Sequence, residues 1–284
     1  MIDFHTHPVQ VADLFDDDPT LTRAVQDVFG LWMSPQPLRT YELHIEEAGA
    51  DKAVAVPLDC TTAHGMTVVS NAQIARLMEL TDRVIGFASV DPGQEGAADT
   101  LKRDVREYGL RGLKLDPALQ QFDVADADRA FPVYQAAAEL GIPLLIDCGL
   151  SWAPKGRAEL ARPLALEPAI HAFPELQIVI SHFAWPWVDE AVALALKHRN
   201  VHLETSILNS GTPPESLRLA LDRIGIDLLD RSLHAQVVFG SDYPRVDPKR
   251  VADGVRGLGL RPALERKVFN DNAVRLLRLE GTAA

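Results

Sequence analysis

The chain of 284 residues has few cysteines, fewer basic than acidic residues and no long apolar run. Its two cysteines, Cys60 and Cys148, do not form the pattern of a disulfide scaffold, so a reducing cytoplasm is the expected location. The net charge of −12 argues against nucleic acid or an anionic membrane as the main partner. No apolar stretch approaches the length that spans a bilayer, and nothing resembling a signal peptide precedes the first predicted strand.

Short apolar runs recur along the chain, and helical patterns lie between them. The predicted strands cover residues 2–4, 53–56, 84–88, 112–115, 143–146, 177–180, 201–203 and 236–239. Most are continuous apolar runs, as expected for parallel strands that are buried on both faces. In the intervening segments apolar residues follow helical spacing, and Gly141 is predicted to end one such helix before the fifth strand.

Eight alternating strand and helix units without a composition break predict an α/β fold, a (β/α)₈ TIM barrel that forms a single domain over residues 1–284. The alternative is a doubly wound open sheet, which more often carries a glycine-rich phosphate turn after its first strand. That turn is lacking here, because His-Thr-His-Pro occupies residues 5–8. The segment over residues 8–40 is long for a strand-to-helix loop, so we expect it to shape a pocket or an interface.

Two histidines, His5 and His7, end the first predicted strand. On an extended strand, residues i and i+2 point to the same side, so both imidazoles can aim at one point. Such a pair suits a borderline metal such as zinc. The motif is weak by itself, and its value depends on where other candidate ligands fall.

Further polar residues lie at the ends of other predicted strands. Lys114 lies in the fourth strand, Asp147 ends the fifth, His182 follows the sixth, and Asp242 follows the eighth. In a barrel of parallel strands all these carboxyl ends open onto one face, where catalytic groups gather. We therefore expect these side chains to become neighbours of the two histidines.

Other residues near these strand ends are candidates for contacts with a substrate. Trp152 and Trp185 follow the fifth and sixth strands and could wall an apolar or aromatic pocket, or pack in the core. Arg245 could hold a substrate anion. Lys114 could meet a substrate carboxylate, pair with a nearby aspartate, or be carbamylated.

A series of motifs resembles one known family. They are His-Thr-His at residues 5–7, Gly-Phe-Ala-Ser-Val-Asp-Pro at 86–92, Gly-Leu-Lys-Leu at 112–115, Ser-His-Phe at 181–183, Phe-Gly-Ser-Asp-Tyr-Pro at 239–244 and Asn-Asp-Asn-Ala-Val-Arg-Leu-Leu at 270–277. In this order they are similar to the amidohydrolase superfamily, in the amidohydrolase-related branch (amidohydrolase family 2) that includes aminocarboxymuconate-semialdehyde decarboxylase and the resorcylate decarboxylases. The resemblance covers nearly the whole chain and implies a TIM barrel of the metal-dependent hydrolase type.

The resemblance also implies roles for particular residues. His5 and His7 would bind one divalent metal, Asp242 would be a further ligand that moves a proton, and His182 would hydrogen-bond the metal's water or a substrate oxygen. The family usually has a histidine at the end of the fifth strand, where this chain has Asp147. A carboxylate is a harder ligand than an imidazole, so two histidines and two aspartates favour manganese or zinc.

The sequence therefore predicts a metal-dependent hydrolase that opens a small ester, lactone or amide with metal-activated water. The alternative is a metal-dependent decarboxylase of an aromatic or unsaturated carboxylic acid. A third reading is a non-catalytic barrel that has lost its metal at Asp147. The expected partner is a small-molecule substrate, with neither nucleic acid nor membrane, and a homodimer is the default assembly.

Overall fold

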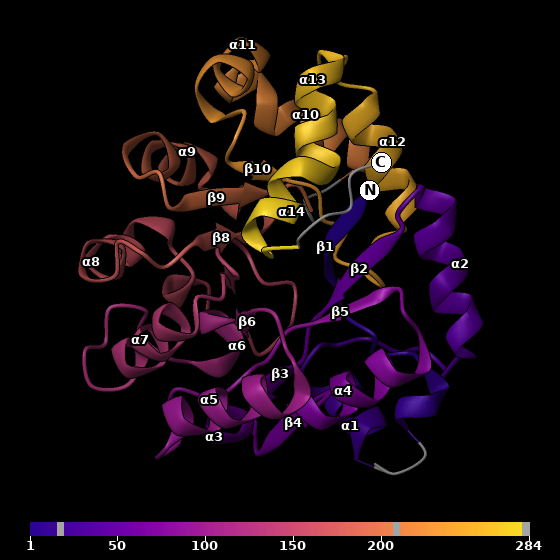
Figure 1. The fold of residues 1–284 in the computed structure, drawn as a ribbon, viewed down its shortest axis with the longest axis vertical. Coiled ribbons are helices and arrows are strands. Elements are labelled where there is room, and N and C mark those ends of the chain that lie inside the picture. Colours follow the sequence, from indigo (N-terminus) through magenta and orange to yellow (C-terminus); the bar gives the residue numbers. More distant parts are fainter. Residues whose placement is uncertain (16–19, 207–210, 280–284) are drawn as a thin grey trace.

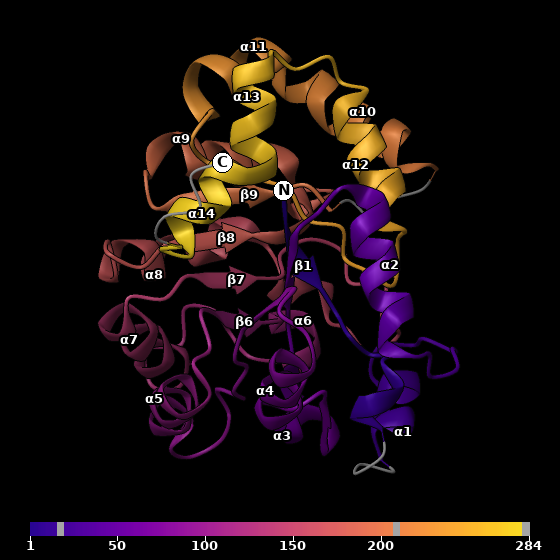
Figure 2. The same ribbon diagram turned by 45° about the vertical axis from the view of Figure 1, so that its right-hand side comes forward.

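The computed structural model describes residues 1–15, 20–206 and 211–279. Within them, eight parallel strands form a barrel that is wrapped by helices (Figures 1 and 2). The barrel strands are β1 (Ile2–Thr6), β2 (Lys52–Ala55), β5 (Val84–Gly86), β6 (Leu113–Leu115), β7 (Leu144–Ile146), β8 (Ile178–Ile180), β9 (Val201–Glu204) and β10 (Val237–Val238). Each lies in one of the predicted apolar runs or overlaps it, which confirms the predicted (β/α)₈ barrel.

The barrel closes on itself. Its strands hydrogen-bond in the orders β1-β2-β5 and β6-β7-β8-β9-β10. Parallel bridges join the two groups, from Ala88 to Leu113 on one side and from Thr6 to Tyr243 on the other. The alternative of a doubly wound open sheet is therefore wrong.

Helices follow most of the strands and cover the outside of the barrel (Figure 1). Their bounds are α1 (Leu21–Asp27), α2 (Leu38–Ala48), α3 (Thr61–His64), α4 (Asn71–Leu80), α5 (Ala97–Tyr108), α6 (Pro117–Gln120), α7 (Ala130–Leu140), α8 (Glu167–Ala172), α9 (Val188–Lys197), α10 (Pro213–Ile224), α11 (Ile226–Leu228), α12 (Pro248–Arg256), α13 (Pro262–Arg266) and α14 (Asn272–Leu276). Gly141 ends α7 with a φ of 66°, as predicted, because glycine adopts the left-handed conformation without steric cost. None of the helices in the described ranges combines the length and apolar character needed to cross a bilayer.

A short antiparallel hairpin, which the sequence did not predict, follows β2. It consists of β3 (Leu58–Cys60) and β4 (Met66–Val68). Short 3₁₀ turns and π-helical turns complete the connections, including η1 (Ala12–Leu14) in the long segment after β1 and η4 (Ser181–Ala184) after β8.

The interior of the barrel is packed at the end where the strands begin. Its buried side chains are Ile2, Phe4, Val54, Val56, Ile85, Phe87, Leu145, Val179 and Val238 from the strand segments, with Ala273, Leu276 and Leu277 from α14 and the residue after it. Figures 1 and 2 both show α14 beside the start of β1. This end is closed by apolar packing, so polar chemistry is left to the opposite end, where the strands finish.

A shift in the pairing of β1 with β2 turns its last residues toward that end. Asp3 pairs with Ala53, but Thr6 pairs with Ala55, so β1 holds one extra residue between these positions. A bulge of this kind changes the direction of a side chain. Phe4 packs in the apolar barrel interior, and the next residue, His5, also reaches groups on strands across the barrel.

Candidate active site at the carboxyl ends of the strands

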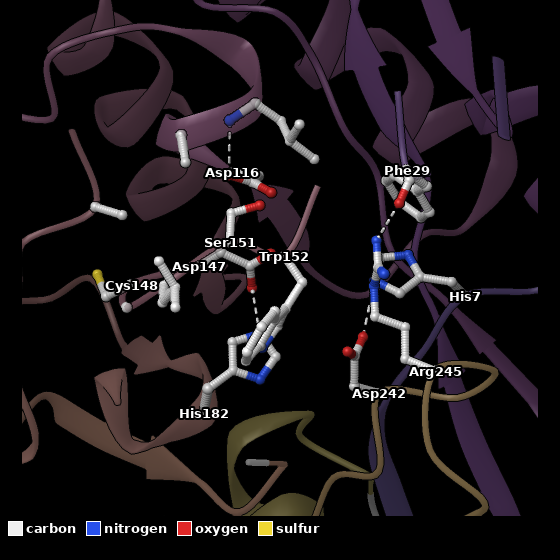
Figure 3. A pocket seen from close by; sticks show the side chains of 15 residues that line it. His7, Phe29, Asp116, Asp147, Cys148, Ser151, Trp152, His182, Asp242 and Arg245 are labelled. Atoms are coloured by element: carbon white, nitrogen blue, oxygen red, sulfur yellow. Dashed lines mark hydrogen bonds and ion pairs between the residues drawn. The ribbon is translucent and has the colours of Figure 1, made fainter. Parts of the chain in front are cut away.

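A pocket opens where the strands end (Figure 3). Six of the residues predicted from the sequence line it, namely His7, Asp147, Trp152, His182, Asp242 and Arg245. Three others, His5, Lys114 and Trp185, are not among its described lining residues; His5 and Lys114 are fully buried.

Three donor atoms meet beside this pocket. The Nε2 atoms of His5 and His7 lie 3.1 Å apart, and Oδ1 of Asp242 lies 3.7 Å and 3.4 Å from them, respectively. Ligands about 2.0–2.1 Å from a tetrahedral zinc ion are separated by roughly 3.4 Å. All three side chains are buried. The donor set therefore fits one divalent metal ion, and ligation of a metal by these residues stays a prediction.

The backbone brings Asp242 to the two histidines. Its amide donates to the carbonyl of His5 at 2.9 Å, and its φ of 58° is unusual for a residue other than glycine. Such a strained conformation persists only where the surrounding fold holds it in place, and it is common at functional sites. The sequence motif after β10 therefore delivers the carboxylate to the end of β1.

Burial and charge set the protonation of these ligands. Burial lowers the pKa of His7 to about 4, in spite of the nearby Asp242, so the ring is neutral at pH 7. Burial alone would raise the pKa of Asp242, but His7 and His5 hold it well below its usual range. A neutral imidazole and an ionised carboxylate are the forms that bind a metal.

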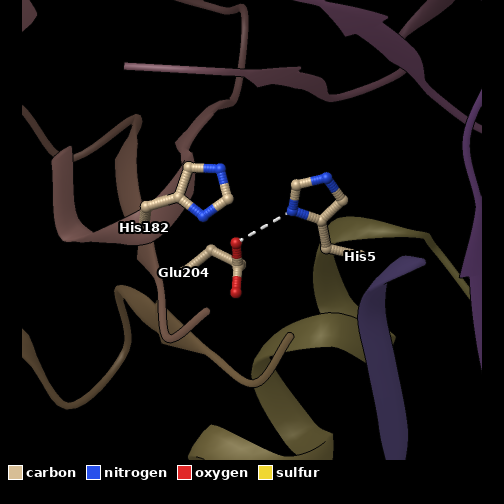
Figure 4. Close-up of side chains that lie close together, drawn as sticks. All are labelled: His5, His182 and Glu204. Atoms are coloured by element: carbon tan, nitrogen blue, oxygen red, sulfur yellow. Dashed lines mark hydrogen bonds and ion pairs between the residues drawn. The ribbon is translucent and has the colours of Figure 1, made fainter. Parts of the chain in front are cut away.

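Glu204, at the end of β9, contacts the Nδ1 side of the His5 ring (Figure 4). The sequence analysis did not predict this residue as part of the site. Its Oε2 lies 3.1 Å from Nδ1 of His5, and it accepts from the hydroxyl of Ser206 at 2.6 Å. Burial would raise the pKa of Glu204, but His5 and other partners lower it, so the carboxylate accepts the Nδ1 proton. The Nε2 lone pair of His5 then faces the candidate metal position. The signal was available, because Glu204 directly follows the predicted strand over residues 201–203.

On the opposite side of the site, Asp147 forms ion pairs with two basic residues. Lys114 Nζ donates to Oδ1 of Asp147 at 2.5 Å, and Nε2 of His182 lies 3.5 Å from the same oxygen. The pair with Asp147 is one of the three alternatives that the sequence left open for Lys114. Burial would raise the pKa of Asp147, but Lys114 and His182 lower it well below its usual value.

His182 is held in a defined direction. Its Nδ1 donates to the backbone carbonyl of Ser206 at 2.6 Å, which leaves Nε2 facing Asp147 at the pocket. Its φ is 61°, so both predicted catalytic residues adopt the left-handed conformation. Burial would lower the pKa of His182, but the Asp147 carboxylate and further acidic groups raise it to about 9. The ring is therefore cationic at pH 7.

Asp116, another pocket residue that the sequence reasoning missed, follows β6. It caps α6 by accepting from the amide of Leu119 at 3.0 Å. Burial, together with the charge of Asp147, raises its pKa to about 7. Asp116 thus adds a titratable group to the pocket wall.

Asp147 lies apart from the groups that could hold a metal. Among the described residues, two such groups lie at the barrel mouth: His5, His7 and Asp242, and His5, His182 and Glu204. Asp147 belongs to neither, and its role as a ligand stays a prediction.

The remaining predicted residues lie at the rim. Trp152 stacks on Trp185 with ring centres 6.4 Å apart and planes 8° from parallel. Arg245 donates to the carbonyl of Phe29 at 2.6 Å, and Phe29 also lines the pocket. Phe29 belongs to the long segment over residues 8–40, so the described part of that segment shapes a pocket, as expected. The contacts of Arg245 and the tryptophans with a substrate stay predictions.

Barrel and donor set together define a (β/α)₈ enzyme with a candidate site for one divalent metal. The sequence profile of the Amidohydrolase family matches residues 2–279, so the chain belongs to the amidohydrolase family and is an enzyme. No functionally curated protein matches the chain in sequence.

Solved structures share the fold. An uncharacterized TIM-barrel protein from Bordetella bronchiseptica aligns with a TM-score of 0.76 and 22% identity, covering 98% of each chain. A putative 2-pyrone-4,6-dicarboxylic acid hydrolase from Pseudomonas putida aligns with a TM-score of 0.70 and 19% identity, over 98% of this chain and 97% of that one. A dihydroxybenzoic acid decarboxylase from Polaromonas, with bound manganese and the inhibitor 2-nitroresorcinol, gives a TM-score of 0.66 and 19% identity, over 99% and 97%.

Proposed function

We propose that the protein is a metal-dependent hydrolase that cleaves a small ester, lactone or amide. The observation that carries this proposal is the placement of two groups of opposite protonation around one pocket. Asp242 is ionised beside the metal-type donors His5 and His7, and His182 is cationic on another wall (Figure 3). Groups whose environments push their pKa values apart are suited to act as base and acid.

One divalent ion, zinc or manganese, would be held by His5, His7 and Asp242. When bound, it would supply the Lewis acidity that activates water and polarises a carbonyl group. The hydrolase structure among the neighbours and the manganese in the decarboxylase structure support this choice of chemistry and metal.

The chain's own residues would then divide the proton transfers. Asp242 accepts a proton from the attacking water, while the new bond forms to the carbonyl carbon. His182 donates a hydrogen bond to the carbonyl oxygen as that oxygen gains negative charge. When the bond to the leaving oxygen or nitrogen breaks, Asp242 returns its proton to that atom.

A second candidate is the non-oxidative decarboxylation of an aromatic acid. The stacked Trp152 at the pocket and the decarboxylase among the structural neighbours favour it. That reaction needs a proton donor to the substrate carbon. Asp242 is ionised, so it starts as a proton acceptor, as attack by water requires, and not as the proton donor that decarboxylation requires. The hydrolase is therefore the better fit.

Substitution of Asp242 tests the proposal. The metal-loaded protein is assayed against small esters, lactones and amides, and against hydroxybenzoate-type acids with detection of carbon dioxide. We expect Asp242→Asn to lower turnover by about 10²–10⁴-fold, as for loss of a general base. Metal content is measured in each sample, and Asp247→Asn, at the exposed cap of α12, is the matched control. Full turnover by the metal-loaded Asp242→Asn protein would rule out this role, and release of carbon dioxide without carbonyl hydrolysis would favour the second candidate.

A further inference from the structure

A buried lysine, Lys114, lies beside the candidate metal position and has no part in the proposed proton transfers. Its side chain has no exposed surface and comes from the middle of β6. It is not among the described residues that line the pocket, and its contact with a substrate stays a prediction. Its ammonium group lies between two residues, Asp147 at 2.5 Å and Nε2 of His5 at 3.0 Å.

The contact with His5 uses the atom that a metal needs. Glu204 accepts from Nδ1 of His5, so Nε2 carries the free lone pair. A lysine ammonium has three donor hydrogens and no acceptor, so it can only donate to that lone pair. The lone pair cannot be given fully to Lys114 and to a metal ion at the same time.

Charge adds to this conflict. A divalent ion bound by His5 would lie close to the Lys114 ammonium, and because Lys114 and His5 are both buried, solvent would screen the repulsion only weakly. Because Lys114 is fully buried, it cannot move its charge into water without a change in the surrounding structure. Asp147 is the acceptor that can hold it away from His5.

We propose that Lys114 is an internal cation that competes with the divalent metal for Nε2 of His5, and that Asp147 sets the strength of this competition by holding Lys114. The inference rests on the proposed metal-dependent function. It also gives Asp147 a role that needs no direct bond to the metal, which accounts for its place outside the candidate metal groups.

The test is metal affinity, measured without any assay of activity. Chelator-stripped protein is titrated with Zn²⁺, and separately with Mn²⁺, in competition with a fluorescent chelator. Lys114→Met keeps a long unbranched side chain and removes the charge, and we expect it to bind the metal at least about tenfold more tightly than the wild type. Lys102→Met is the control, because Lys102 pairs with Glu139 on the outer helices and is 30% exposed. It should bind metal like the wild type.

A second pair of variants removes the influence of an unpaired Asp147. In Asp147→Asn, Lys114 loses its carboxylate partner and should compete more strongly, so metal binding weakens. The double variant Lys114→Met with Asp147→Asn leaves neither charge buried without a partner, and it should bind metal more tightly than Asp147→Asn alone. This comparison also serves if Lys114→Met by itself does not fold.

The outcomes separate this inference from the proposed function. Suppose that the wild type binds metal, that Lys114→Met binds it no more tightly than the wild type, and that the double variant binds it no more tightly than Asp147→Asn. Competition by Lys114 is then overturned while the metal centre stands. If the wild type and both Lys114 variants bind no metal, the metal centre and the inference are both overturned. Tighter binding in both comparisons supports the inference.

Discussion

Two parts of the barrel mouth use the same kinds of residue in different ways. At the ends of β1 and β10, His5, His7 and Asp242 place donor atoms 3.1–3.7 Å apart, as around a metal ion. At the end of β7, Asp147 is already paired with the ammonium of Lys114 from β6, and His182, which follows β8, lies 3.5 Å from it. A strand-end carboxylate is thus available to a metal only where no buried cation from the protein already occupies it.

The two parts also differ in the charge of their histidines. The ring of His7 is neutral at pH 7 because burial outweighs the nearby Asp242, whereas the ring of His182 is cationic because Asp147 outweighs burial. A neutral ring can bind a metal, and a cationic ring can stabilise an oxyanion. The predictions below test this division of roles.

Of the predicted changes, removal of His7 should have the largest effect on Zn²⁺ binding and turnover. We expect His7→Ala to weaken Zn²⁺ binding on the order of 100-fold or more, since one of three close donors is lost. Turnover should fall with metal occupancy. Metal affinity and steady-state kinetics measure both, with His234→Ala as the control, because His234 contacts Lys267 and belongs to none of the candidate metal groups among the described residues. An unchanged metal affinity in His7→Ala would show that the three donor atoms do not form the site.

Removal of Glu204 should have a smaller effect on the same part. Loss of a carboxylate that orients a metal-binding histidine commonly lowers metal affinity by about 10–100-fold, and we expect this range for Glu204→Ala. Glu204→Gln keeps an acceptor oxygen and should lose less. The same competition titration measures both variants, with the half-exposed Glu139→Ala as the control. Equal affinities for Glu204→Ala and the wild type would mean that Glu204 does not set the tautomer of His5.

The cationic ring of His182 beside Asp147 should make the stability of the protein depend on pH. The pKa of His182 is raised from 6.5 to about 9 in the folded protein. The contribution of the protonated His182 ring to the free energy of unfolding is therefore complete below about pH 6.5 and is lost as the pH rises through 9. The free energy of unfolding of the wild type, relative to His182→Gln, should fall over this window by at most on the order of 3 kcal/mol.

Denaturant unfolding in the presence of a chelator, at several values of pH from 6 to 9.5, measures this difference. A difference that stays constant across the window would show that His182 is not held in its cationic form by Asp147.

The strands were predictable because most are continuous apolar runs, and the helix of residues 130–140 because its spacing and Gly141 agree. The hairpin of β3 and β4 was missed, since strands of three residues carry little pattern. In the site, His5, His7 and Asp242 were placed together by one rule, that parallel strands of a barrel end on the same face. Glu204 obeys the same rule and was overlooked.

The sequence by itself determined the barrel, the face on which its polar residues gather, and the family. Apolar runs are local features that predict the strands and hence the barrel, and the motifs, in their order along the chain, resemble one family. Only the tertiary structure decided that Lys114 pairs with Asp147 and touches His5, and that Glu204 supports His5. Those contacts join residues 33–199 positions apart, and they depend on the register of strands, on the bulge in β1 and on which buried charges can be balanced.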